Sequence, residues 1–244
     1  MSTAETRLRT FGMGIFLSFG AYGVGQIVAL IAILALMAFG INVQNSPGIL
    51  LLVSSVMLQG VTFGGIALVY LNYRDLGLDF IHVHVPSLRD IGVAIGGFVL
   101  LFGALNVISS VIQSLGLHSA ENSVVDIASG NPAVFLLLIP LSFLLIGPGE
   151  ELLYRGLIQG VLRESFSPVP AVILSSVLFA SIHFFSLQGS GKFVYLATVF
   201  FLALILGSVY EYTNNLAVPI LIHGAYDATL FGLQYLMATG QIHP

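Results

Sequence analysis

Long apolar runs, separated by short polar segments, organise the 244 residues of the chain. Seven such runs lie at residues 11–39, 48–73, 91–115, 132–162, 169–185, 193–210 and 216–237. Each is at least as long as the roughly 17 residues that the shortest transmembrane helices need to cross a hydrocarbon core. The pattern therefore predicts an all-α fold, a polytopic membrane helix bundle of seven transmembrane helices.

The fourth run leaves the number of spans open. It covers residues 132–162 and is interrupted by the sequence GPG at 147–149. Because proline removes a backbone donor and glycine weakens a helix, this point can kink a helix or end it. The run is therefore one kinked helix or two shorter pieces, and an eight-span bundle is the alternative. No internal repeat or low-complexity tract divides the chain, so residues 1–244 are predicted to form a single integral membrane domain.

The positive residues predict how the bundle lies in the membrane. If seven spans alternate in direction, Lys192 falls at one end of the bundle and five arginines fall at the other, with the N-terminus: Arg7, Arg9, Arg74, Arg89 and Arg163. Positive loop residues are enriched on the cytoplasmic side. We therefore expect a multi-pass protein of the cell membrane with a cytoplasmic N-terminus. The first run, 29 residues long, exceeds the apolar region of a cleaved signal and is predicted to be retained.

Composition narrows the functional classes. Hydrophobic residues make up 57% of the chain and charged residues only 7%, whereas a soluble domain carries roughly 25% charged residues. The formal net charge of -4 forms no basic surface, so the lipid bilayer is an expected partner and nucleic acid is not. The chain contains no cysteine, so any metal ion would have to be bound by His, Asp or Glu.

Six ionisable residues lie inside the apolar runs, all in the second half of the chain: Glu150, Glu151, Arg155, His183, His223 and Asp227. The first three runs contain none. An ionised side chain at bilayer depth is costly, so such residues usually belong to a functional site. Their confinement to one half of the chain indicates a single site, and a packing network without catalysis is the alternative.

Two pairs among these residues have helical spacing. Glu151 and Arg155 are four residues apart, so on a helix they are neighbours that neutralise each other. Glu150 is rotated by about 100° from Glu151 and remains available for chemistry. His223 and Asp227 are also four residues apart. The aspartate can therefore hold the imidazole in one tautomer, or share a metal ion or a substrate with it.

Counting along the fourth and fifth runs places Glu150 and His183 at a similar depth. The two runs form a hairpin that turns near Phe166, sixteen residues after Glu150 and seventeen before His183. His223 fits less well, because it lies only eight or nine residues from the next turn, at 214–215. Either the hairpin tip projects beyond the bilayer, which the charged residues there favour, or the last run begins deeper. Taken alone, His183 is more typical of a packing residue than of a ligand.

Three motifs occur in order on successive predicted helices: EELLYR at 150–155, FASIH at 179–183 and HGAYD at 223–227. They are similar to the pattern EExx(F/Y)R, FxxxH and HxxxN or HxxxD of the CAAX protease and bacteriocin-processing (Abi) family of intramembrane endopeptidases, which includes the type II CAAX prenyl endopeptidase. The resemblance covers residues 139–230. It implies an endopeptidase that acts on a membrane-associated peptide or protein, either a prenylated one or a leader peptide.

The resemblance also implies roles for the site residues. Glu150 resembles the glutamate that activates water, and Glu151 and Arg155 resemble its accompanying pair. His183 and His223 resemble the catalytic histidines. The two histidines with a carboxylate would also make a set of ligands for zinc or another divalent metal, although the same groups can work without one.

Asp227 departs from the family pattern. It stands where prenyl-protein members generally carry asparagine. An amide can donate a hydrogen bond to an oxyanion, whereas an ionised aspartate cannot. The departure weakens the implied specificity for prenylated proteins.

Two functions of other classes fit the same residues. A proton-coupled transporter would use the cluster of acids and histidines as a relay, although the chain has no paired repeats. A non-catalytic membrane scaffold or immunity protein would share the fold and lack turnover. Other intramembrane proteases fit poorly, because the sequence contains no HExxH, GxSG or GxGD motif.

Overall fold

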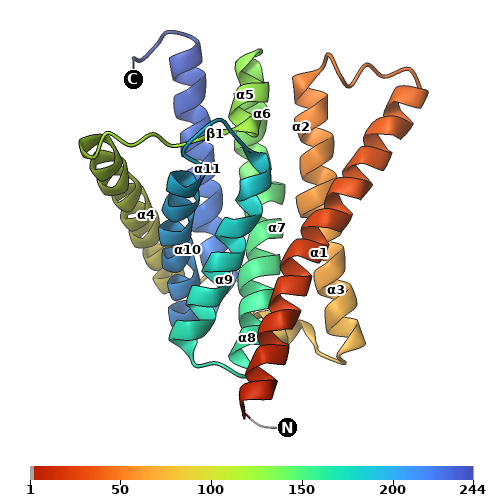
Figure 1. Cartoon of the computed structure of the whole chain (residues 1–244), viewed down its shortest axis with the longest axis vertical. Helices are drawn as coiled ribbons and strands as arrows, with labels where there is room; N and C mark the ends of the chain where they lie inside the picture. Colours follow the sequence, from red (N-terminus) through yellow and green to blue (C-terminus); the bar gives the residue numbers. More distant parts are fainter. Residues whose placement is uncertain (1–2, 244) are drawn as a thin grey trace.

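The computed structural model describes residues 3–243, and most of them are helical (Figure 1). The first half contains α1 (Thr3–Ala38), α2 (Pro47–Ser55), the π-helical segment η1 (Val56–Phe63), α3 (Gly64–Tyr73), the 3₁₀ turn η2 (Leu78–Ile81) and α4 (Leu88–Ser114). Strand β1 (Glu121–Asn122) and the short α5 (Ser123–Ser129) follow. The predicted all-α fold is confirmed.

The second half forms four long helical segments. The first is built from α6 (Ala133–Leu141), η3 (Ser142–Ile146), α7 (Gly147–Glu151), η4 (Leu152–Gln159) and α8 (Gly160–Arg163). The second is α9 (Pro168–Ile182), followed by the 3₁₀ segment η5 (His183–Ser186) and strand β2 (Leu187–Gln188), which pairs antiparallel with β1. The third and fourth are α10 (Lys192–Thr213) and α11 (Ala217–Ala238).

Among the described residues, six helical segments are long and apolar enough to cross a membrane: Thr3–Ala38, Pro47–Tyr73, Leu88–Ser114, Ala133–Arg163, Pro168–Ser186 and Lys192–Thr213. They correspond to the first six predicted runs. The seventh run forms α11, which has the same length as α10 but is less apolar because it carries His223, Asp227 and Gln234. The chain is therefore a multi-pass membrane protein whose seven predicted runs form seven long helical segments.

The fourth predicted run is one irregular helix. It continues from Ala133 to Arg163 without a break, so the GPG sequence does not divide it into two spans. Two of its segments, η3 and η4, are π-helical and lie on either side of α7. Pro148 lies two residues after η3 inside this continuous helix, so its missing backbone donor falls at the π-helical distortion. Because π-helical turns are frequent at functional sites, α7 is a candidate position for such a site.

The long segments alternate in direction, and the N- and C-termini lie at opposite ends of the bundle (Figure 1). The five arginines predicted to share the N-terminal end lie at the helix ends and loops on that side, whereas Lys192 begins α10 at the opposite end. The alternation agrees with an odd number of crossings. The cytoplasmic assignment of the N-terminal end stays a prediction.

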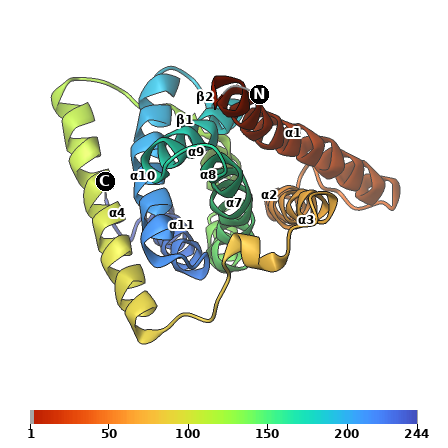
Figure 2. The same ribbon diagram turned by 90° about the horizontal axis from the view of Figure 1, so that it is seen from below.

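The fourth and fifth spans form the centre of the bundle. Within their most apolar windows 44% of the residues are buried, against 11% to 28% in the other four candidate spans. Viewed from below, α7 to α11 are flanked by α1, α2 and α3 on one side and by α4 on the other (Figure 2). The largest fully buried side chain of the described residues is that of Arg155, so the interior contains charge.

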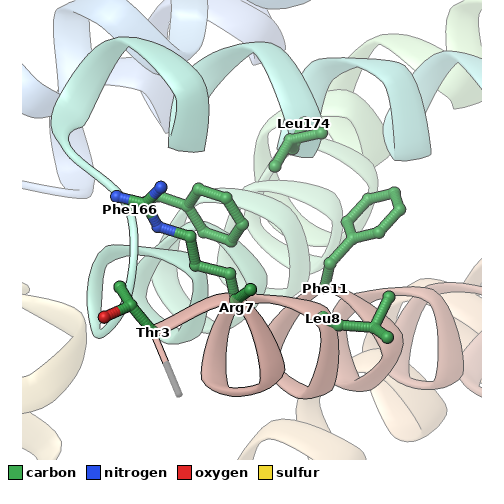
Figure 3. A pocket seen from close by; sticks show the side chains of 7 residues that line it. Thr3, Arg7, Leu8, Phe11, Phe166 and Leu174 are labelled. Atoms are coloured by element: carbon green, nitrogen blue, oxygen red, sulfur yellow. The ribbon is translucent and has the colours of Figure 1, made fainter.

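A surface groove of about 600 Å³ lies at the N-terminal end, between α1 and the turn before α9 (Figure 3). Its lining is mostly apolar and includes Phe11, Phe166 and Leu174. The Arg7 guanidinium lies 5.8 Å from the Phe166 ring centroid, and its Nε donates to the Ser165 carbonyl at 3.4 Å. None of the six ionisable residues of the spans lines this groove. The groove lies where the first span packs against the tip of the hairpin between the fourth and fifth spans.

Candidate active site

Three of the central helical segments supply the six ionisable residues singled out in the sequence. The fourth span carries Glu150 and Glu151 on α7 and Arg155 on η4, while His183 begins η5 and α11 carries the last two, His223 and Asp227. Glu151 and Arg155 are 0% and 1% exposed, and Glu150 and His223 are 8% and 7% exposed. Charged groups buried to this extent need partners, and the packing of the helices provides them.

Glu151 connects the fourth span to α11. Its Oε1 accepts a hydrogen bond from Nη1 of Arg155 at 3.0 Å, which is the predicted pair four residues apart. The same oxygen lies 2.7 Å from Nδ1 of His223. Because a carboxylate only accepts hydrogen bonds, Nδ1 of His223 carries a proton in this contact. Glu151 thus sets the orientation of the imidazole.

The other nitrogen of His223 faces two carboxylates. Its Nε2 lies 3.4 Å from Oδ2 of Asp227, the predicted partner four residues on, and 3.8 Å from Oε2 of Glu150. A hydrogen bond to either carboxylate requires a proton on Nε2 as well. His223 therefore lies between two groups of charged residues. Its Nδ1 faces the Glu151–Arg155 ion pair, and its Nε2 faces Glu150 and Asp227.

The guanidinium of Arg155 contacts three groups. In addition to Glu151, its Nη2 donates to the Ala203 carbonyl of α10 at 3.2 Å. Its guanidinium carbon lies 4.6 Å from the centroid of the Phe179 ring. A guanidinium over an aromatic face is stabilised by the charge distribution of the ring. The buried charge is thus neutralised by Glu151 and fixed by α9 and α10.

In the described part of the chain, His183 is held by Phe179 rather than by hydrogen bonds to the other ionisable residues. Its Nδ1 lies 2.8 Å from the Phe179 carbonyl, and its ring packs against the Phe179 ring with centroids 4.8 Å apart. Because a carbonyl accepts, Nδ1 of His183 carries a proton in this contact. Glu150 interacts electrostatically with His183 as well as with His223 and Asp227. No hydrogen bond or ion pair within residues 3–243 joins His183 to the other five.

The turn between α10 and α11 is covered, with Asn215 and Leu216 only 3% and 1% exposed. The Leu216 amide donates to the His82 carbonyl of the preceding loop at 2.9 Å, and Asn215 Oδ1 accepts from the His84 amide at 3.1 Å. The start of α11 is therefore covered by the loop that contains His82 and His84, and the two arrangements that the sequence left open for the depth of His223 both stay predictions.

Two residues that the sequence did not single out also reach the site. Gln59 of η1 points its Nε2 at Oε1 of Glu150, at a distance of 3.5 Å. Tyr195 of α10 interacts electrostatically with Asp227 and Glu150, and its hydroxyl accepts from Nδ2 of Asn122 at 3.0 Å. Neither belongs to a recognisable motif. The only signal for Gln59 was a polar residue within an apolar run.

The described residues contain no group of three metal-ligating side chains, from His, Asp or Glu, that could hold a metal ion. Glu151 occupies Nδ1 of His223, and the Phe179 carbonyl occupies Nδ1 of His183. Each of the two histidines proposed from the sequence as ligands therefore has Nδ1 engaged and Nε2 left over, and metal-binding histidines commonly donate their other ring nitrogen to a carboxylate or a carbonyl in this way.

Comparison with known proteins identifies the segment that carries the site. Residues 132–229 match the model of a protein family described as type II CAAX prenyl endopeptidase Rce1-like. No curated protein and no solved structure matches the chain. The matched segment contains all six predicted site residues and omits the first three spans, including Gln59. The matched family is one of CAAX protease-type intramembrane endopeptidases, and residues 132–229 of this membrane protein are similar to its type II CAAX prenyl endopeptidase Rce1-like domain.

Proposed function

We propose that the protein is an intramembrane endopeptidase in which Glu150 activates a water molecule for attack on a peptide bond. The observation that carries the proposal is the position of Glu150, a nearly buried carboxylate whose Oε2 lies 3.8 Å from a ring nitrogen of His223. Glu151 is occupied by Arg155 and by the other ring nitrogen of His223. Glu150 therefore keeps an oxygen directed at Nε2 of His223 and is the candidate base.

The proposed reaction proceeds in two proton transfers. Glu150 takes a proton from water while the water oxygen bonds to the scissile carbonyl carbon, and the carbonyl electron pair moves to its oxygen. The Nε2–H of His223 stabilises the oxyanion that forms. When the intermediate collapses, the C–N bond breaks and Glu150 returns the proton to the leaving amine. His183, which interacts electrostatically with Glu150, would help to hold the attacking water.

The remaining residues act by holding these groups in place. Arg155 fixes Glu151, and Glu151 keeps the proton on Nδ1 of His223. The arrangement leaves Nε2 as the nitrogen that faces the reacting atoms. Asp227, at 3.4 Å from Nε2, orients the same ring from the opposite side.

The proposed substrate is a membrane-associated peptide or protein. The site lies within the spans, so a substrate has to reach it from the bilayer or its surface. The family description favours a prenylated peptide, while the departure at Asp227 keeps a leader peptide as an equal alternative. The test is incubation of the protein in proteoliposomes with a farnesylated CAAX peptide and with an unprenylated leader peptide, followed by mass spectrometry of the products. Absence of any product from both would favour the non-catalytic scaffold.

The Asp227→Asn variant distinguishes a metal-independent site from a metal site. We expect it to keep or exceed wild-type turnover, with no response to a chelator, because an asparagine amide can donate a hydrogen bond to the oxyanion. If Asp227 instead supported a metal-bound His223, the substitution would weaken metal affinity by about 10- to 100-fold. Turnover of wild type and variant is measured with chelator and with added zinc. Loss with chelator and recovery with zinc in the wild type would contradict the metal-independent mechanism.

A further inference from the structure

Gln59 lies in the first half of the chain, outside the segment 132–229 that matches the endopeptidase family. It belongs to η1, the π-helical centre of the second span, which packs against α1 and α7. The span around it is otherwise apolar from residue 56 to 61. A glutamine in such a span is costly unless its amide has partners, and π-helical turns often mark functional positions.

The backbone of η1 is held close to the residue before Glu150. A Cβ at Gly149 would collide with the backbone carbonyl of Gln59, so only glycine allows this approach of α7 to η1. The contact brings the Gln59 side chain beside the carboxylate, with Nε2 at 3.5 Å from Oε1 of Glu150. Catalytic hydrogen bonds are often long in the free enzyme and shorten when substrate binds. The glycine and the glutamine therefore form one structural unit with Glu150.

The two halves of the Gln59 amide have different surroundings. The nitrogen donates to Glu150, whereas the carbonyl Oε1 is buried and has no hydrogen-bond partner among the described residues. A buried acceptor without a partner destabilises a folded protein, and a water molecule that accompanies the reaction is one group that can satisfy it. Both halves lie on one planar group, which places the unused acceptor next to the proposed base.

We propose that Gln59 is a further residue of the active site, which positions Glu150 and binds the attacking water. Its Nε2 holds Oε1 of Glu150, leaving Oε2 to take the proton, and its Oε1 accepts a hydrogen bond from the same water. Gln59 itself gains and loses no proton. The proposal rests on the proposed endopeptidase function, and it extends the site to a span that the family match does not include.

The test is the Gln59→Met variant, which keeps the length of the side chain and removes both amide groups. We expect kcat to fall by about 10- to 100-fold, the effect of one hydrogen bond to a charged group, while KM is unchanged. Cleavage of a farnesylated CAAX peptide is measured in proteoliposomes and divided by the folded fraction of each preparation. Gln59→Leu serves as a second apolar replacement, for which the same loss of kcat is expected.

Thr62→Val is the matched control, because Thr62 lies on the same π-helical segment, is buried, and donates to the Met57 carbonyl at 2.7 Å. We expect it to retain wild-type kcat. An equal loss of kcat in Thr62→Val and Gln59→Met would show that any disturbance of η1 lowers turnover, and it would overturn the proposal. Wild-type kcat in Gln59→Met would also overturn it and leave the proposed function intact. If wild type itself cleaves neither peptide, the proposed function fails and this proposal fails with it.

Discussion

Glu150→Gln is expected to lower turnover by about 10²- to 10⁴-fold, the contribution typical of a positioned general base, while the protein still inserts and folds. The amide has the size and shape of the carboxylate but cannot accept the proton from water. It also keeps a hydrogen-bonding group beside Gln59, so little structural change is expected. The measurement is peptide cleavage in proteoliposomes, together with thermal unfolding in detergent.

The matched control for this variant is Glu164→Gln, at the end of the same helical run. Its carboxylate forms an ion pair with Arg74 at 3.2 Å, and its side chain is 35% exposed. The same chemical change there should leave turnover unaltered. If Glu150→Gln retained turnover, another group would have to be the base. Asp227, the other carboxylate near Nε2 of His223, would then be the next candidate.

The contacts within one helix could be predicted from the sequence. The spacing of Glu151 and Arg155 predicted an ion pair, and that of His223 and Asp227 predicted a shared face, because residues four apart meet on any helix. Both pairs occur in the structure. The contact between Glu151 and His223 could not be predicted in the same way. The two residues are 72 positions apart, and only the packing of α11 against the fourth span brings them together.

The positions of the spans could be predicted from the sequence, whereas their contacts with distant parts of the chain could not. The apolar runs fixed the long helices, because length and hydropathy are local properties. GPG is compatible with a kink, a break or a π-helical distortion, so the continuity of Ala133–Arg163 needed the structure. The turn before α11 is covered by the loop containing His82 and His84, which lies in a distant part of the sequence. Gln59 has no partner within its own helix, so no spacing rule could connect it with Glu150.

Arg155→Ala is expected to cost about 3–5 kcal/mol of stability, the usual effect of removing one partner from a buried ion pair. The pair is 1% and 0% exposed, so solvent cannot replace the missing partner of Glu151. Turnover should fall as well, since Glu151 would no longer be fixed where it holds Nδ1 of His223. Glu151→Gln should have a comparable effect, because it leaves Arg155 charged and without its carboxylate. The measurements are thermal unfolding in detergent and peptide cleavage.

Arg163→Ala is the matched control, eight residues further along the same helical run. Arg163 also has an acidic partner, Glu211 at 3.3 Å, but its side chain is 38% exposed. An exposed pair contributes only about 0–1 kcal/mol, so a small change is expected. The double variant of Glu151→Gln with Arg155→Ala should lose less than the sum of the single losses, because each single change leaves a partner charge behind. Equal unfolding temperatures of wild type and Arg155→Ala would show that the buried pair does not stabilise the bundle, and the positioning role of Arg155 would have to be abandoned.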